Sequence, residues 1–157
     1  MFYLWIIFLI FIDLFTKFIA KNDLQVQKNL VGDFLYLKYV ENIWIAFSIP
    51  LTGIALKILT IVLIWVIFWY YYTEEKKKNS KLIDISFIFV LAGALGNGYE
   101  RVFHSKVIDF IWLKYFSVFN FADIFISVWV SLYILSLILL NKKELWAKMI
   151  TFSDQEK

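Results

Sequence analysis

The chain has 157 residues, of which 62% are hydrophobic and 21% aromatic, and it carries more apolar surface than one soluble core of this length can bury. It has no cysteine and one histidine, which excludes disulfides, a thiolate nucleophile and metal centres built from cysteines or from several histidines. Its net charge of +3 comes from scattered short clusters, so no basic face for nucleic acid is present and no nucleic-acid partner is expected. The composition predicts an integral membrane protein whose chemistry falls to carboxylates.

Four hydrophobic stretches approach the roughly 20 residues that a helix needs to cross a bilayer. They cover residues 2–20, 51–72, 82–98 and 121–140. The first contains Asp13 and Lys17 and lacks a basic leader and a small-residue cleavage site, so it is expected to be a retained helix. The predicted fold class is an all-α membrane protein, a four-transmembrane-helix bundle that forms a single domain over residues 1–157.

Two longer segments join the predicted spans. Residues 22–50 contain a Gly32-Asp33 turn signal followed by β-branched and aromatic residues, which predicts a short strand pair on the membrane surface. Residues 102–120 mix aromatic residues with Lys106 and Lys114, a composition typical of the lipid headgroup zone.

The lysines predict how the chain is oriented. The loop at 73–81 and the tail after residue 140 each hold four lysines, and the positive-inside rule places both on the cytoplasmic side. Both termini are therefore expected in the cytoplasm. Basic residues also occur on the other side, where they are spread over longer segments.

Two acids, Asp109 and Asp123, lie where predicted spans meet the outer segments. An ionisable side chain at a membrane span is costly to keep there, so such a pair indicates a working site. Each of three spans also carries polar residues at helical spacing on one face, namely Asp13, Thr16 and Lys17, then Asn97, Glu100 and Arg101, then Asn120 and Asp123. Small residues at 92–98 would let neighbouring helices approach closely and bring these faces together.

Simpler interpretations remain open at this point. Asp13 and Lys17 are spaced as an ordinary i, i+4 ion pair, and Glu100 with Arg101 is interpreted as structural. Asp109 and Asp123 could be a buried polar pair that only holds helices together.

The chain resembles lipoprotein signal peptidase, the bacterial signal peptidase II family, in five blocks that occur in order along nearly its whole length. The blocks are Asp13-Leu14-Phe15-Thr16-Lys17, Asn42 with Ala46-Phe47-Ser48, Gly93-Ala94-Leu95-Gly96-Asn97 with Glu100-Arg101, Val107-Ile108-Asp109-Phe110, and Phe119-Asn120-Phe121-Ala122-Asp123. The resemblance implies a four-helix intramembrane aspartic endopeptidase with an extracytoplasmic β-cradle. Such an enzyme removes the signal peptide from diacylglyceryl-modified prolipoproteins, cutting immediately before the lipidated cysteine.

The resemblance also implies roles for individual residues. It makes Asp109 and Asp123 the catalytic dyad, and it gives supporting or substrate-binding positions to Asp13, Lys17, Asn42, Asn97, Arg101 and Asn120. It implies no metal or cofactor, prolipoproteins and membrane lipids as partners, and a bacterial cytoplasmic membrane location with the site on the extracytoplasmic side. We expect a monomer. The chain departs from the family pattern at Glu100, where Asp is usual, and at Trp44 and Ile45, where small residues are usual.

Other classes of function fit parts of the pattern. A small proton or ion pathway would use the acids as relay groups, but it predicts polar residues at several depths of the membrane. A non-catalytic lipid- or lipoprotein-binding scaffold would tolerate replacement of either acid. A metal-dependent hydrolase would hold a hard cation between carboxylates and asparagines and would be sensitive to chelators.

Overall fold

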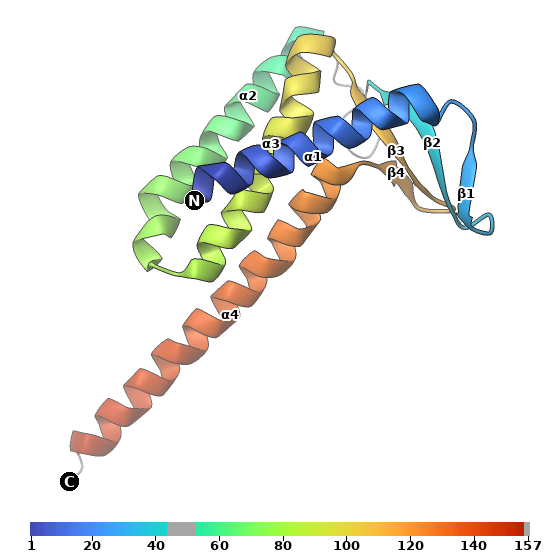
Figure 1. The fold of residues 1–157 in the computed structure, drawn as a ribbon. Coiled ribbons are helices and arrows are strands. Elements are labelled where there is room, and N and C mark those ends of the chain that lie inside the picture. The colour runs from blue at the N-terminus through green and yellow to red at the C-terminus, as the bar shows by residue number, and fades with distance from the viewer. Residues whose placement is uncertain (44–52, 156–157) are drawn as a thin grey trace.

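The structure, a computed structural model, describes residues 1–43 and 53–155 (Figure 1). Within these residues, four helices are long and apolar enough to cross a membrane. They are α1 (Phe2–Asp23), α2 (Gly53–Tyr70), α3 (Lys81–His104) and α4 (Phe121–Gln155). After α2 the chain continues through a π-helical turn, η2 (Tyr71–Glu75), and a 3-10 turn, η3 (Lys76–Lys78). The four predicted helices are confirmed, while residues 51–52 of the second predicted span lie outside the described residues.

The helices run further than the apolar stretches that predicted them. The α3 helix continues past Gly98 to His104 because the charged Glu100 in that extension is buried and paired inside the protein. The α4 helix continues past residue 140 to Gln155, and Figure 1 shows that this part extends beyond the other three helices. Hydropathy therefore located the spans but not the helix ends.

The centre of the bundle is α3. In its most apolar stretch 61% of the residues are buried, against 11–17% in the other three helices, whose exposed apolar side chains suit contact with lipid. Small residues bring its neighbours close, as the sequence predicted: Gly93 lies against the Ala122 backbone of α4 and Gly96 against Asp13 of α1. On a third face Gly98 meets the Ile64 side chain of α2.

Four strands form one antiparallel sheet in the order β1-β2-β3-β4. The strands β1 (Lys28–Val31) and β2 (Leu35–Asn42) confirm the predicted strand pair. The strands β3 (Val107–Leu113) and β4 (Ser117–Phe119) were not predicted individually. The helix bundle with a small antiparallel sheet confirms the fold that the resemblance implies, and the label all-α alone is too narrow for it. The sequence of β3 does not alternate between polar and apolar residues, because the first half of the strand is buried on both faces. Its pairing with β2 is a long-range contact, which a local sequence pattern does not reveal.

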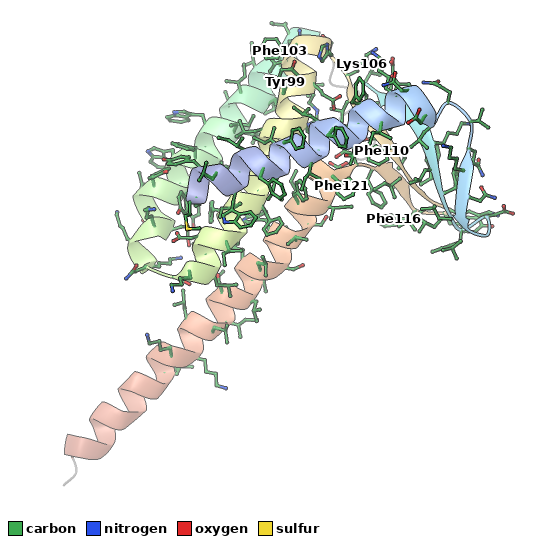
Figure 2. All side chains as sticks on the ribbon, viewed as in Figure 1. Tyr99, Phe103, Lys106, Phe110, Phe116 and Phe121 are labelled. Carbon is green, nitrogen blue, oxygen red and sulfur yellow. The ribbon has the colours of Figure 1, made fainter. Side chains whose placement is uncertain are left out.

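The sheet lies at one end of the bundle. Ala20 and Leu24, at the end of α1, pack against Phe110 of β3. The ring of Phe110 also meets that of Phe121 at the start of α4, with centroids 6.1 Å apart, and Figure 2 shows these two residues where the sheet joins the helices. We call this the sheet end of the bundle. The opposite end, which carries η2 and η3, we call the lysine-rich end.

Candidate active site

Asp109 lies on β3 at the sheet end and is 2% exposed. Its side chain is on the same buried face as that of Val107, two residues earlier on the strand. The two carboxylate oxygens accept different amides: Oδ1 accepts Asn120 Nδ2 at 2.6 Å, and Oδ2 accepts Asn42 Nδ2 at 2.8 Å. The carboxylate is thus oriented from β2 on one side and from the start of α4 on the other.

Asp123 lies in the first turn of α4 and is partly buried. Its Oδ2 accepts the Asn120 backbone N–H at 3.2 Å, and its own N–H donates to Asn120 Oδ1 at 3.0 Å. This reciprocal pair is the capping-box pattern, which satisfies helix-terminal N–H groups and favours an acid three residues into the helix. The remaining oxygen, Oδ1, accepts Asn97 Nδ2 of α3 at 2.9 Å.

Two asparagines connect the two acids. Asn120 and Asn97 are both nearly fully buried, and Asn120 Nδ2 lies 3.1 Å from Asn97 Oδ1. One amide therefore contacts Asp109 and the other contacts Asp123. The structure brings the two predicted acids into a single hydrogen-bonded group.

Behind this group lies a buried lysine. Lys17 Nζ donates to Asp13 Oδ2 at 2.8 Å and to Asn97 Oδ1 at 2.8 Å, and it lies 2.9 Å from Glu100 Oε2. The predicted i, i+4 ion pair is present, but Lys17 also joins α1 to α3. Asp13 uses its other oxygen, Oδ1, to accept the Ala122 N–H at 2.9 Å, next to Asp123.

Arg101 acts on the two acids at longer range. Its guanidinium interacts electrostatically with Asp123, Asp109 and Glu100. Among the residues that the structure describes, its Nε is buried without a hydrogen-bond partner. The predicted supporting position is thus close enough to influence the acids through its charge.

Glu100, which the sequence predicts to be structural, contacts two other elements at the site. The side chain is 5% exposed, pairs with Lys17 and accepts the backbone N–H of Ile108, the residue before Asp109, at 3.2 Å. Its spacing of three residues from Asn97 was the sequence signal that placed both side chains on one face of the helix. The departures at Trp44 and Ile45, and the block Ala46-Phe47-Ser48, lie outside the described residues.

Burial raises the pKa of Asp109 to about 6. The Asn42 hydrogen bond opposes this rise, and the negative charge of Asp123 adds to it. Burial and the neighbouring negative charge therefore favour the protonated form of Asp109 near neutral pH. Such a pair can take a proton from water with one member and give a proton with the other.

A cleft of about 370 Å³ opens beside Asp123. The β3–β4 hairpin forms one wall with Phe116 and Phe119, and α4 forms the other with Ser127 and Val128. The lining is mostly apolar and includes the carboxylate of Asp123 and the hydroxyls of Ser127 and Ser131, so the cleft suits a largely hydrophobic group with a polar part near Asp123. In the described part of the chain, no cluster of three or more acidic or histidine side chains is arranged to hold a metal ion.

Comparisons with known proteins show which family the chain is similar to. A model of the family described as Signal peptidase (SPase) II matches residues 5–139. The lipoprotein signal peptidase of Clostridium acetobutylicum is 34% identical over 76% of this chain and 81% of its own length. The lipoprotein signal peptidase of Fusobacterium nucleatum subsp. nucleatum is 32% identical over 90% of this chain and 88% of its own.

A solved structure of a bacterial membrane enzyme, obtained by the in meso method, shares the fold with a TM-score of 0.76. It is 24% identical in sequence and covers 87% of both chains. The family model spans most of the chain, including both predicted acids and the asparagines between them. The chain therefore belongs to the signal peptidase II family.

Proposed function

We propose that this protein is an aspartic-type prolipoprotein signal peptidase, which removes the signal peptide from diacylglyceryl-modified prolipoproteins by cutting before the lipidated cysteine. The observation that carries the proposal is the pair Asp109 and Asp123, joined through Asn120 and Asn97 in a chain of the signal peptidase II family. Buried acids that are held by neutral amides suit proton transfer. Acids that only attached one helix to another would be expected to have a cationic partner.

In the proposed mechanism Asp109 is the proton donor and Asp123 is the general base. Asp123 lines the cleft, so it can take a proton from the water that attacks the scissile carbonyl. Asp109 gives its proton to the carbonyl oxygen, which produces a neutral tetrahedral diol. Asp123 then gives its proton to the leaving amine as the C–N bond breaks, and one hydroxyl of the diol returns its proton to Asp109 as the product carboxylic acid forms. These two transfers restore the dyad without a covalent intermediate.

The cleft and the membrane spans support a lipid-modified substrate. Acyl chains packed along the apolar surface of the bundle would contribute about 0.8 kcal/mol per buried CH₂ group. We further propose that the protein is a monomer in the bacterial cytoplasmic membrane, with both termini in the cytoplasm. The sheet would then be an extracytoplasmic cradle beside the site.

The test is cleavage of a lipid-modified prolipoprotein by purified protein in detergent. We expect the parent to cut before the lipidated cysteine, Asp109→Asn and Asp123→Asn to lose more than about 10³-fold in rate, and a chelator to change nothing. Asp23→Asn, at an exposed position at the end of α1, is the matched control and should keep full activity.

Three outcomes would contradict the proposal. Cleavage that survives both substitutions would remove the dyad, and loss of activity with chelator would favour a metal-dependent hydrolase. A folded parent that binds several lipid-modified prolipoproteins without cutting any of them would favour the scaffold.

A further inference from the structure

Glu100 connects α1 to the strand that carries Asp109. It lies near the end of α3, and its Oε2 accepts from two groups, Lys17 Nζ at 2.9 Å and the Ile108 backbone N–H at 3.2 Å. The side chain is 5% exposed, so both contacts form away from bulk water. A hydrogen bond to a buried charged acceptor is roughly twice as strong as a neutral one, which makes this a firm attachment.

The residue that Glu100 holds is directly before Asp109. Its two backbone polar groups are both contacted by side chains from helix ends: Glu100 accepts the Ile108 N–H, and Asn120 Nδ2 lies 3.3 Å from the Ile108 carbonyl oxygen. The same Asn120 amide donates to Asp109. The backbone leading into Asp109 is therefore fixed from α3 and from the start of α4 together.

Lys17 explains why a charged acceptor is needed at this place. Its buried ammonium lies between two carboxylates, Asp13 on its own helix and Glu100 on α3. A buried cation that loses one of its partners is costly, so the Lys17 ammonium holds the Glu100 carboxylate in place. The position of β3 is thereby tied to α1, which it does not reach through a sheet hydrogen bond.

We propose that Glu100 is a positioning residue of the candidate active site. Its carboxylate accepts the Ile108 N–H while it is held by the Lys17 ammonium. In this way Glu100 sets the position of Asp109 relative to Asn120 and Asp123. This inference rests on the proposed function, because positioning has meaning only if the dyad is catalytic. Glu100 itself touches neither proposed acid by a hydrogen bond within the described residues.

The test compares Glu100→Ala, Glu100→Gln and Glu100→Asp in the cleavage assay. We expect Glu100→Ala to lower kcat by about 100-fold with KM changed by less than about twofold, because a misplaced group slows chemistry without touching substrate. Glu100→Gln keeps an acceptor but loses the charge, so a loss of about tenfold in kcat is expected. Glu100→Asp keeps the charge and should retain more activity than Glu100→Ala.

Glu41→Gln is the matched control. Glu41 lies directly opposite Ile108 in the β2–β3 register and pairs with Lys106 at 2.7 Å, but it lies at the exposed surface. The same chemical change, equally near Asp109 in the sheet, should therefore leave kcat within about twofold of the parent, since a surface ion pair contributes little.

Hydrogen exchange at the Ile108 amide provides a readout that does not depend on activity. Loss of its acceptor in Glu100→Ala should speed exchange about tenfold, while Glu41→Gln should not change it. If Glu100→Ala does not fold, Glu100→Gln decides the kinetic test. Unchanged kcat in folded Glu100→Ala or folded Glu100→Gln, or a loss that falls on KM alone, would overturn the proposal. If the parent cleaves nothing, the proposed function fails, and unchanged Ile108 exchange would separately overturn the attachment of β3.

Discussion

The two acids are held differently, although both belong to one hydrogen-bonded group. Asp109 is on a strand, is 2% exposed and receives side-chain amides on both oxygens. Asp123 is in the first turn of a helix, accepts a backbone N–H and lines the cleft. Unequal surroundings push the protonation of two neighbouring acids apart, which is how a pair acquires separate acid and base roles.

The raised pKa of Asp109 leads to a prediction about pH. Because burial raises this pKa to about 6, Asp109 carries its proton below that pH and loses it above. If Asp109 is the proton donor, kcat/KM should fall as pH rises through about 6, approaching tenfold per pH unit. Cleavage rates measured from about pH 4 to 9 would show this falling limb. A rate that rises through the same range would assign the donor role to Asp123.

Replacement of Asn42 tests whether Asp109 is the group that titrates in this pH range. Its hydrogen bond favours the ionised form of Asp109 and so lowers the pKa. Replacement by Ala should raise the pKa, and the falling limb of kcat/KM should move to higher pH. A limb that stays in place, or that moves to lower pH, would show that the limb reports another group.

At the scale of elements, close helix contacts hold the site together, and the contact of Gly96 with Asp13 is one of them. A Cβ at this position would lie 2.5 Å from Asp13 Oδ2, so Asp13 would have to move. Asp13 also accepts the Ala122 N–H beside Asp123. We therefore expect Gly96→Ala to lower kcat by at least about tenfold, since small displacements at a reacting group are costly.

Gly98→Ala is the control for Gly96→Ala. It makes the same change two residues along α3, where a Cβ would meet the end of the flexible Ile64 side chain at 2.7 Å. This contact can be relieved by a rotamer change, so activity should stay within about threefold of the parent. Equal losses in both variants would mean that helix packing in general, and not Asp13, is responsible.

A second buried polar cluster joins elements at the lysine-rich end. Glu75 of η2 is 1% exposed and accepts Lys78 Nζ at 2.7 Å and the Tyr133 hydroxyl of α4 at 2.8 Å. Its other oxygen, Oε2, has no hydrogen-bond partner among the described residues. The cluster attaches α4 to the turn after α2, at the end of the bundle opposite the two proposed catalytic acids.

Removing the Tyr133 hydroxyl should therefore cost stability and leave the chemistry intact. Tyr133→Phe takes one donor from a buried carboxylate, which is expected to destabilise the fold by about 1–3 kcal/mol. Thermal unfolding in detergent should show a lower Tm, and kcat at a temperature well below Tm should be unchanged. Tyr115→Phe, at a position that is 92% exposed, should change neither quantity. A normal Tm in Tyr133→Phe would mean that Glu75 finds another partner.

The sequence predicts an element when the pattern that specifies it lies within that element or the turn next to it. The four spans follow from apolar length, and the β1–β2 pair follows from a turn signal between two short runs. The strands β3 and β4 do not, because the apolar run from Val107 to Leu113 becomes a strand through pairing with β2. The bond from Glu100 to Ile108 depends on the same long-range packing, which is why Glu100 was interpreted as merely structural.

For the site itself, spacing located the residues but not their partners. The residue blocks placed Asp109, Asn120 and Asp123 together, and their hydrogen bonds link all three. Periodicity also put Asn97 and Lys17 on inward faces of two helices. It did not reveal that Lys17 bridges Asp13 to Glu100, because a contact between α1 and α3 depends on how two helices cross.

At the scale of the whole molecule, buried polar groups gather at the two ends of the bundle. Between them the α3 helix packs through an apolar cluster that includes Phe87, Leu91 and Ala92, together with Ile6 of α1 and Phe125 of α4. An ion or proton pathway needs polar groups at successive depths. Within the stretch of α3 that forms this cluster Ser86 is buried, but its hydroxyl donates to the Ile83 carbonyl oxygen at 2.8 Å and is not part of a chain of polar groups. The arrangement of the described residues therefore fits one site at one membrane face.

The orientation of the molecule can be tested directly because the chain has no cysteine. The positive-inside rule places the lysine-rich end in the cytoplasm and the sheet end outside. Lys77→Cys puts a single thiol at an exposed position of η3, and Tyr115→Cys puts one in the β3–β4 hairpin. In intact cells of a bacterial host, an impermeant maleimide should label only Tyr115→Cys, and permeabilisation should add Lys77→Cys.

Full denaturation in detergent should allow both thiols to react, which controls for expression and for burial of the label site. The reverse labelling pattern would place Asp109 and Asp123 at the cytoplasmic face. That result would contradict access of a lipidated substrate from the extracytoplasmic side, even if the purified protein cleaved one in detergent. Orientation therefore decides whether the chemistry of the dyad can act on prolipoproteins after their export, which the proposed function requires.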